Sequence, residues 1–302
     1  MKRIAALVTG LLLAAPAGAQ TRTATPLVLL LPASTRAAGM GNAFPLASSD
    51  ADVLFYHPAQ LTGARGFTAS FAAYGTSAMT FSIAAASDWW NGGIGFGLQA
   101  TSYGADSFAD GALAKGEAGL VEEGDLATSE VVGSAGYARS LFGFRVGIAG
   151  KLAEMRVAGE RDVTAAGDVG IARNLGPVTL AASARNLGRD PAFDALDARL
   201  PRTFALGAAA RSRTLGPLDV TLAAAVSRWE DGTFVPEAGV ELAYWPVPGR
   251  TFIARIGARP IEDSDVGTVT LGAGFVGDRI SVDYAFATIE GEAVHRVGIR
   301  MR

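Results

Sequence analysis

The segment "RISVDYAF", residues 279–286, decides the fold of this chain because its side chains alternate in character along its whole length. Consecutive side chains of an extended chain point to opposite faces. One face of this segment is therefore apolar, and the other is small or charged. The apolar face consists of Ile280, Val282, Tyr284 and Phe286. The pattern predicts a β-strand with one apolar side.

The same alternation recurs almost to the end of the sequence and predicts about fourteen strands. Most of them are close to the ~9–11 residues that a tilted strand needs to cross a bilayer. We therefore predict an all-β fold, a transmembrane antiparallel β-barrel that occupies residues 64–302. The predicted strands lie near residues 66–74, 77–87, 91–101, 127–138, 142–153, 163–173, 177–186, 201–212, 217–228, 233–245, 250–259, 266–275, 278–288 and 292–302.

A soluble β-sheet protein is the alternative to a membrane barrel. A soluble sandwich buries the apolar face of each sheet and exposes the other face to water. The second face of the predicted strands is instead rich in Gly, Ala and Ser, which favours the interior of a barrel. Trp89, Trp90 and Trp245 also fall on predicted turns at one end, where aromatic rings at headgroup depth are typical of membrane barrels. In the soluble alternative these rings would cap a packed core.

The composition excludes several other classes of protein. The 302 residues are 49% hydrophobic and only 18% charged, and they include 38 glycines. After the first residues, no uninterrupted apolar stretch reaches the ~18 residues of a helical membrane span, so helical spans are excluded. The sequence has no cysteine, which excludes disulfides and cysteine-based metal sites.

The first residues predict a secretory signal peptide. Lys2 and Arg3 precede an apolar run over 4–15, and the small-residue pattern at 17–19 fits a cleavage site. We therefore assign residues 1–19 to the signal peptide. The remaining chain has 24 basic and 29 acidic residues and a formal charge of −5, without a basic block. Nucleic acid is not an expected partner.

The links between the predicted strands differ in length at the two ends of the barrel. If the first strand runs outward, the periplasmic links are short, for example "DWWN", "RSLF" and "WPVPG". The opposite end has the long polar run over 103–124 and the loops near 154–162 and 188–200, although the links at 75–76 and 229–232 are also short. Short turns on one side and longer loops on the other are typical of outer-membrane barrels. The predicted location is the bacterial cell outer membrane.

Charged residues on the second face are expected to line the lumen, since charges belong where water or an opposite charge reaches them. Both signs occur among them, so the predicted lumen is mixed in charge. The lumen-facing candidates are Arg145, Asp168, Arg185, Glu237, Glu241, Arg255, Asp283 and Arg296, together with Lys151 and Arg300.

Residues 20–63 lack the two-residue period and predict a short helical segment that plugs the barrel. Ser34 or Thr35 is suited to cap a first helix, and Ser48 or Ser49 a second helix that runs through Asp52 to Tyr56. Pro58 is expected to end that helix or to open the next turn. The segment is too small to bury its own apolar face, so we expect it to pack inside the barrel.

This plug segment, "STRAAGMGNAFPLASSDADVLFYHPAQLTG", resembles the N-terminal motif of the PorV/PorQ family and, more distantly, of FadL-type outer-membrane transporters. Those proteins typically have Gly-Met-Gly-Gly-Ala, an Asp-containing stretch and Asn-Pro-Ala-Gly-Leu. Asn42 and His57 stand where the motif usually has Gly and Asn, and Gln60 stands where it has Gly. The plug-motif residues are Gly39, Met40, Gly41, Ala43, Asp50, Asp52, His57, Pro58 and Ala59, followed by Leu61.

The resemblance implies one of two non-enzymatic functions. FadL-type relatives carry hydrophobic small molecules inward, whereas PorV-type relatives are outer-membrane partners of a protein secretion machine. The implied partners are outer-membrane lipid and either a hydrophobic ligand or secretion-system proteins, and no cofactor is implied. Transport is the preferred function, and the secretion role is the alternative.

The residues themselves give little sign of catalysis. The two histidines, His57 and His295, are far apart in sequence, and no zincin, nucleophile-elbow or P-loop motif is present. Asp50 and Asp52 are the only acidic pair in the plug, and a position in the first turn of a helix is preferred over a metal site for them. A barrel enzyme acting on lipid would need a Ser or His at the rim with an acidic partner, and the sequence shows no such pairing.

Overall fold

The chain folds as a closed antiparallel β-barrel of fourteen strands, so the predicted fold is confirmed. The structure is a computed structural model. It describes residues 25–43, 46, 49–74, 78–103, 128–157, 160–193, 198–261, 267–289 and 291–301. The predicted signal peptide and most of the predicted polar loop over 103–124 lie outside these residues.

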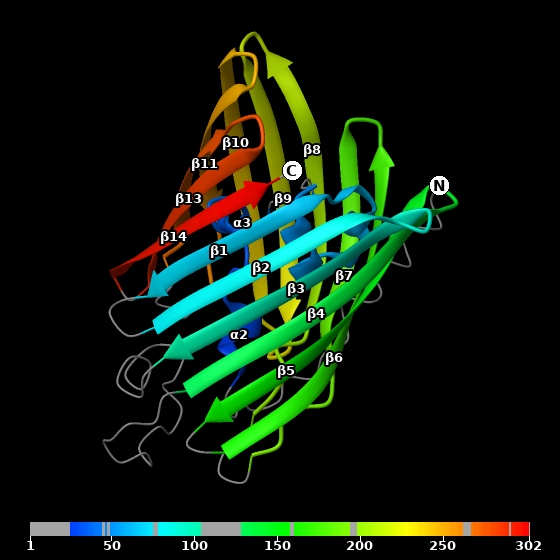
Figure 1. Cartoon of the computed structure of the whole chain (residues 1–302), viewed down its shortest axis with the longest axis vertical. Helices are drawn as coiled ribbons and strands as arrows, with labels where there is room; N and C mark the ends of the chain where they lie inside the picture. The colour runs from blue at the N-terminus through cyan, green and yellow to red at the C-terminus, as the bar shows by residue number, and fades with distance from the viewer. Residues whose placement is uncertain are drawn as a thin grey trace.

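Each predicted strand corresponds to one strand of the barrel, and the ends differ by a few residues. Figure 1 shows β1 to β6 as the near wall. The strands are β1 (Gly66–Tyr74), β2 (Ala78–Trp89), β3 (Gly92–Tyr103), β4 (Thr128–Leu141), β5 (Phe144–Val157), β6 (Glu160–Leu175), β7 (Val178–Gly188), β8 (Thr203–Leu215), β9 (Leu218–Trp229), β10 (Phe234–Val247), β11 (Arg250–Ala258), β12 (Val269–Val276), β13 (Ile280–Ile289) and β14 (Glu292–Met301).

Pairing between the first and last strands closes the barrel. Phe67 of β1 lies opposite Met301 of β14, and the register continues to Tyr74 opposite Val294. Every other strand pairs with its neighbours in the sequence. Closure satisfies the hydrogen bonds of both edge strands, which a sheet in hydrocarbon requires because lipid offers no partners.

The two faces of the strands have the character that the sequence predicts. Outward-facing side chains are large and apolar, and many are well exposed: Ile148 is 60% exposed and Leu152 is 63% exposed. Inward-facing positions alternate with them and hold small, polar and charged residues, most of them buried. An apolar exterior around a polar interior is the arrangement of a membrane barrel and the reverse of a soluble one.

The short links at the end where β2, β4 and β6 finish are tight turns. Gly143, Gly176 and Gly249 have φ values of 79°, 60° and 79°, which favour glycine. Trp90 and Phe142 also have positive φ, at 44° and 51°, and are 76% and 98% exposed. A bulky residue in this region of φ is unusual. Aromatic side chains at this rim therefore keep an unfavourable backbone conformation.

The described part of the N-terminal segment lies inside the barrel, drawn in blue behind the near wall in Figure 1, and forms four short helices. None of the helices in the described part of the chain is long and apolar enough to span a membrane. We call residues 25–65 the plug. Its elements are α2 (Leu27–Leu30), α3 (Thr35–Ala38) and the 3-10 helices η2 (Ala51–Phe55) and η3 (Pro58–Gly63).

The helix ends agree only in part with the predictions. Ser34 caps α3 by accepting a hydrogen bond from the Ala37 amide at 3.2 Å, as predicted. The second helix is shorter than predicted: it is a 3-10 turn with Asp50, not Ser49, at its N-cap. The predicted cap was wrong because the Asp50 backbone is extended and the turn starts one residue later. Pro58 opens η3, the second of the two predicted alternatives.

The plug packs closely against inward-facing glycines of the barrel wall. A Cβ atom built on Gly93 would lie 1.8 Å from the Leu61 carbonyl oxygen, and one on Gly147 would lie 2.4 Å from the Pro58 carbonyl carbon. Outward-facing Gly133 has only open space around such an atom. Glycine on the inner face is therefore required for plug packing.

We predict that Gly93→Val will displace η3 and destabilise the protein by ~1–3 kcal/mol, because overpacking forces neighbouring backbone to move. The measurement is equilibrium unfolding of the refolded protein in detergent micelles. Gly133→Val is the matched control and should leave the midpoint nearly unchanged. Equal effects of the two substitutions would show that the inner glycines do not seat the plug.

Candidate functional site

Six charged side chains, five of them buried and Arg36 partly buried, form a closed ring of ion pairs between the plug and one wall of the barrel. Positive and negative groups alternate around the ring, so three arginines are balanced by three carboxylates. Two members belong to the plug and four to the strands β10, β11, β13 and β14. In order around the ring, the members are Arg36, Asp50, Arg300, Asp283, Arg255 and Glu241.

The plug half of the ring joins α3 and η2 to two strands. Arg36 Nη1 lies 2.8 Å from Asp50 Oδ2, and Arg36 Nη2 lies 2.6 Å from Glu241 Oε1. A second bond from Arg36 Nε to Glu241 Oε2, at 2.8 Å, makes this contact bidentate. Arg300 Nη1 lies 3.1 Å from Asp50 Oδ1. Bidentate arginine–carboxylate pairs fix geometry as well as charge.

The other contacts of the ring join residues of the barrel wall to one another. Arg300 Nε donates to Asp283 Oδ2 at 2.6 Å, and Arg255 Nε donates to Glu241 Oε2 at 2.6 Å. Arg255 Nη1 lies 2.7 Å from Asp283 Oδ1. This contact is an ion pair whose angles do not meet those of a hydrogen bond. Arg255 is 4% exposed and Asp283 is 2% exposed. Each of these buried charges thus has two opposite neighbours.

Asp50 has a different role from the one that its position in the sequence suggests. For Asp50 and Asp52, the sequence predicts a position in the first turn of a helix. Asp50 is the N-cap residue of η2, but its side chain makes no capping bond there and instead contacts Arg36 and Arg300. Asp50 thus lies one residue before the first turn, whereas Asp52 lies within it as predicted. Burial alone would raise the pKa of Asp50, yet the two guanidinium groups hold it below its usual value.

Asp52 lies in the first turn of η2 but outside the ring. It is buried, and burial followed by the nearby charge of Asp50 raises the pKa of Asp52 to about 7. Asp52 therefore changes charge near neutral pH, while Asp50 stays ionised. The plug thus contains one titrating carboxyl group beside a fixed ring of charges.

A second polar cluster lies on the opposite wall, in β5, β6 and β7. Lys151 Nζ lies 2.8 Å from Asp168 Oδ2 and donates to Asn186 Oδ1 at 2.8 Å. The backbone amide of Asn186 donates to Asp168 Oδ1 at 2.8 Å. Arg185 precedes Asn186 and has its guanidinium 6.0 Å from the ring centre of Tyr56 in the plug. In the described structure, no carboxylate lies within ion-pair distance of Arg185.

The remaining lumen-facing candidates are separated from one another. Glu237 pairs with Arg259 at 3.3 Å on β10 and the segment after β11. Arg296 is 2% exposed and donates to the hydroxyls of Ser70, Tyr74 and Thr80 at 2.9–3.0 Å. Arg145 lies near the turn between β4 and β5 and donates to Asn174 at 3.3 Å. These residues line the lumen at different heights and around different walls.

The plug motif contacts the wall through its glycines. Gly41 has a φ of 59°, and a Cβ there would lie 2.7 Å from the Ala258 carbonyl oxygen. Gly39 packs in the same way on Gly272. Met40 and Ala43 are fully buried. Asn42, where the resembled motif has Gly, has a φ of 64°, and Asn is among the residues that best tolerate this conformation.

The end of the motif packs near the turn end of the barrel. His57 lies over Gly170, where an added Cβ would be 2.8 Å from the imidazole. Burial lowers the pKa of His57 to about 4, so the ring is neutral at pH 7. Pro58 and Ala59 pack against the Gly147 backbone. Among the described residues, no group of three His, Asp or Glu side chains is placed to hold a metal ion.

Sequence reasoning missed two charged residues that matter here. Arg36 stands inside the quoted motif but was not singled out, although it is the only charged residue of α3. Glu130 was not among the predicted lumen-facing residues, yet it is 1% exposed and accepts a hydrogen bond from the Val28 amide of α2 at 2.7 Å. A charge within an otherwise small, apolar helix was the available signal for Arg36.

Comparison with known proteins identifies the fold. No family model matches the sequence, and no curated protein matches it significantly. The P. putida toluene transporter TodX superposes with a TM-score of 0.52 at 14% identity, over 87% of this chain and 95% of that chain. The Ralstonia pickettii toluene transporter TbuX gives a TM-score of 0.54 at 12% identity, over 88% and 97% of the two chains.

A third solved structure gives the same result. A Pseudomonas aeruginosa FadL homologue has a TM-score of 0.51 at 10% identity, over 90% of this chain and 98% of that chain. Similarity at such low identity shows a shared fold alone. The chain thus has the fold of the FadL-like outer-membrane barrels, and the resemblance to PorV/PorQ proteins stays a prediction.

Removing one carboxylate from the ring should release the plug. We expect Glu241→Gln to destabilise the protein by ~3–5 kcal/mol, because Arg36 and Arg255 each lose one carboxylate and the ring keeps one uncompensated positive charge. Unfolding in micelles and maleimide labelling of an Ala37→Cys variant report the effect, since the natural chain has no other thiol. Glu154→Gln, in an exposed cluster with Arg156 and Arg161, should change neither signal. Unchanged labelling in the Glu241 variant would contradict the anchoring role.

The plug should be more stable in mild acid than at neutral pH. The pKa of Asp52 is about 7 in the folded protein against an ordinary value of 3.8, so the protonated carboxyl favours folding and this stabilisation is lost as pH rises through 7. The denaturant concentration at the unfolding midpoint of the natural chain should therefore be lower at pH 8 than at pH 5. Asp52→Asn should flatten the profile, and an unchanged slope would contradict the assignment.

Proposed function

We propose that this protein transports hydrophobic small molecules that carry an anionic head across the bacterial outer membrane. The observation that carries the proposal is a small cavity between the plug and the wall, lined by three leucines of the plug and by three cations. The function is non-enzymatic. It combines the membrane placement of the barrel with the chemistry of this cavity.

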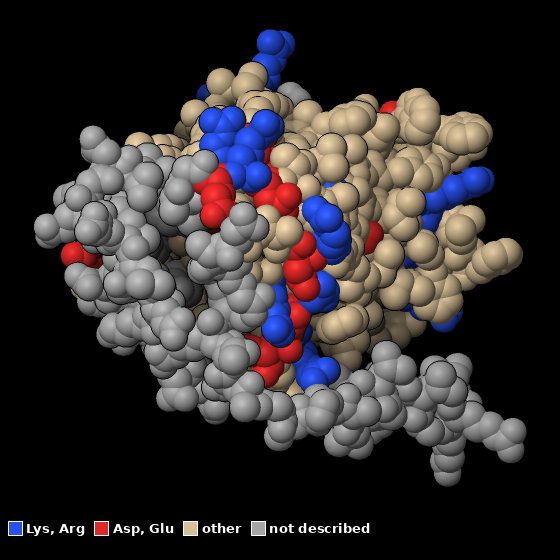
Figure 2. All heavy atoms as spheres, turned by 90° about the horizontal axis from the view of Figure 1, so that it is seen from below, with Lys and Arg blue, Asp and Glu red and all other residues tan. Residues whose placement is uncertain are grey.

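The exterior supports placement in a membrane. Large apolar side chains face outward on all parts of the barrel, and Phe96 and Phe252 are 56% and 53% exposed. Exposed apolar surface of this extent is unfavourable in water. On the face shown in Figure 2, most acidic and basic residues lie in a central mixed band and a few basic residues lie at the edges, while most of the remaining described surface is uncharged. A barrel of this kind is stable when hydrocarbon covers its outer face.

The cavity has an apolar side and a cationic side. Leu29, Leu30 and Leu31 of the plug supply the apolar side, together with Trp229 at the end of β9. The cationic side groups are Lys151, Arg185 and Arg259. An amphipathic ligand presents both surfaces at once, with an apolar body and a charged head. The lining therefore fits such a ligand better than a plain hydrocarbon.

The charges around the cavity leave one cation in excess. Asp168 balances Lys151, and Glu237 balances Arg259. Arg185 has no carboxylate within ion-pair distance in the described part of the chain. A ligand carboxylate would supply the missing partner, and arginine binds carboxylates in a bidentate manner. The head group of the substrate is thus proposed to bind Arg185.

Passage requires part of the plug to move, since the cavity has a volume of only about 20 Å³. The first helix, α2, is held by the Val28 amide bonded to Glu130 and by Gln99 bonded to the Val28 carbonyl oxygen at 3.0 Å. The later plug elements are fixed by the ring of six charges. We propose that α2 is displaced by substrate while α3 and η2 stay in place.

A PorV-type role as an outer-membrane partner of a protein secretion system is the second candidate. The exposed aromatic residues Trp90 and Phe142 favour it, because they stand at the tips of neighbouring turns and keep an unfavourable backbone conformation. Strained conformations are retained where they serve a function. A Trp90→Ala/Phe142→Ala variant that transports normally but loses a copurifying protein would favour this candidate.

The transport proposal is tested with the protein reconstituted in vesicles. Uptake of dodecanoate should exceed uptake of dodecanol, and Arg185→Gln should abolish the difference by slowing dodecanoate alone. Arg228→Gln, which removes an arginine from the outer wall beside Phe234, is the matched control. Equal uptake of both probes by the natural protein would contradict the anionic head group, and uptake of neither would contradict transport itself.

A further inference from the structure

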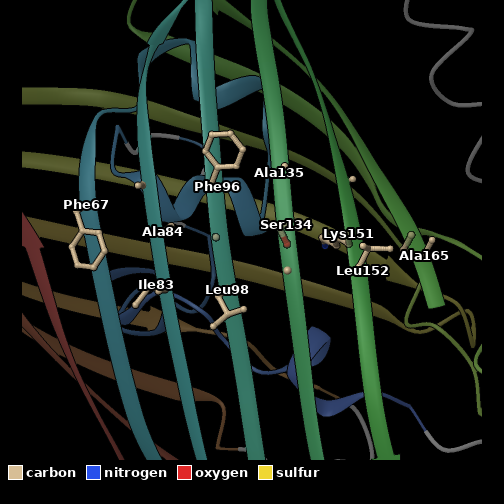
Figure 3. A pocket seen from close by; sticks show the side chains of 15 residues that line it. Phe67, Ile83, Ala84, Phe96, Leu98, Ser134, Ala135, Lys151, Leu152 and Ala165 are labelled. Carbon is tan, nitrogen blue, oxygen red and sulfur yellow. The ribbon is translucent and has the colours of Figure 1, made fainter. Parts of the chain in front are cut away.

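The outer wall has a trough that the transport pathway does not use. It has a volume of about 820 Å³ and lies on the lipid-facing side of β1 to β6. Figure 3 shows Phe67, Phe96, Leu98 and Leu152 on the near face of the sheet, with the plug helices behind it. The trough is therefore separated from the lumen by the barrel wall.

Small residues form the floor of the trough, and large apolar residues form its sides. Gly133, Ala135 and Gly150 face outward on neighbouring strands β4 and β5. A Cβ atom added to Gly133 or Gly150 would meet no atom within 4 Å. The floor is thus lower than the surrounding surface because side chains are absent there. Among the described residues, neither the plug nor a neighbouring strand fills the space above these glycines.

Aromatic and cationic side chains border the same strands at the turn end of the barrel. Arg139 of β4 and Arg173 of β6 are exposed, and both occupy outward-facing positions of their strands. The Arg173 guanidinium lies 4.7 Å from the ring centre of Phe144. Tyr137 and Trp89 meet edge to face, with ring centres 6.0 Å apart. Aromatic rings with arginines are typical of the headgroup level of a membrane.

The trough and the rim are within reach of a single lipid molecule. Arg139 follows Ala135 by four residues along β4, which is roughly 13 Å at the rise of a strand. The hydrocarbon of one leaflet is ~15 Å thick, so a chain whose head lies at Arg139 extends over the trough. Arg139 forms no ion pair within the described residues, and the same holds for Arg173. Both guanidinium groups are therefore available to an external anion.

We infer that this face binds an anionic glycerophospholipid of the inner leaflet, with one acyl chain in the trough and its phosphate on Arg139 and Arg173. The apolar floor selects an acyl chain, and the two arginines select a phosphate, which arginine binds in a bidentate manner. In a zwitterionic lipid, the charge of the phosphate is partly balanced by the cationic group of the same headgroup. Negatively charged lipids are therefore preferred at this site over zwitterionic ones.

Native mass spectrometry of the full chain in detergent tests this site. The probes are phosphatidylglycerol and phosphatidylcholine with identical palmitoyl and oleoyl chains. The natural protein should bind phosphatidylglycerol more tightly. Each arginine near a charged membrane surface contributes ~1 kcal/mol, so Arg139→Gln with Arg173→Gln should weaken phosphatidylglycerol binding at least fivefold and remove the preference. Gly150→Leu should weaken binding of both lipids by filling the trough.

Two control variants make the result specific. Arg279→Gln removes an exposed arginine from the same end of the barrel but from the turn before β13, and Ala254→Leu enlarges an outward residue of β11. Both should bind lipid as the natural protein does. Gly133→Leu is a second filling variant should Gly150→Leu fail to fold. Unchanged phosphatidylglycerol binding in the arginine pair, or unchanged binding in a folded filling variant, would overturn the inference. Neither result depends on whether the lumen transports substrate.

Discussion

The ring of ion pairs between the plug and β10 to β14 is the interaction on which the rest of the structure depends. A charge moved from water into a protein interior loses several kcal/mol of hydration, which only well-placed opposite charges offset. Here every charge has two opposite neighbours, and the ring is neutral as a whole. The arrangement exists only when Arg36 and Asp50 stand beside Glu241 and Arg300. A lumen without its plug would leave the wall charges with fewer partners, so the ring specifies where the plug lies.

The ring also explains how one small segment serves both as a seal and as a moving part. Its anchored portion, α3 and η2, packs on wall glycines and shares the ring. Its first helix, α2, lies beyond the ring and touches a cavity with apolar and cationic sides. This division places motion and ligand binding in one part of the plug and stability in another. Segments with fewer stabilising contacts are the ones that open first.

The sequence predicts the wall of this protein much better than it predicts the plug contacts. Alternation in segments such as 279–286 is a local signal, and it correctly indicates each strand and its two faces. Ring contacts join residues 205 and 250 positions apart, as between Arg36 and Glu241 and between Asp50 and Arg300, and no local pattern encodes them. Gly147 faces the lumen and contacts Pro58, whereas Gly150 faces outward onto open space. Alternation along β5 distinguishes these two faces, but it does not indicate which plug residue packs on Gly147.

Amide hydrogen exchange of the natural protein in micelles tests most directly whether the plug is locked in the lumen. The account predicts that the backbone amides of Ala38, Gly39 and Asn42, which are hydrogen-bonded within the plug, exchange as slowly as those of β13 and β14. Exchange of these amides within seconds, while the strands stay protected, would contradict it.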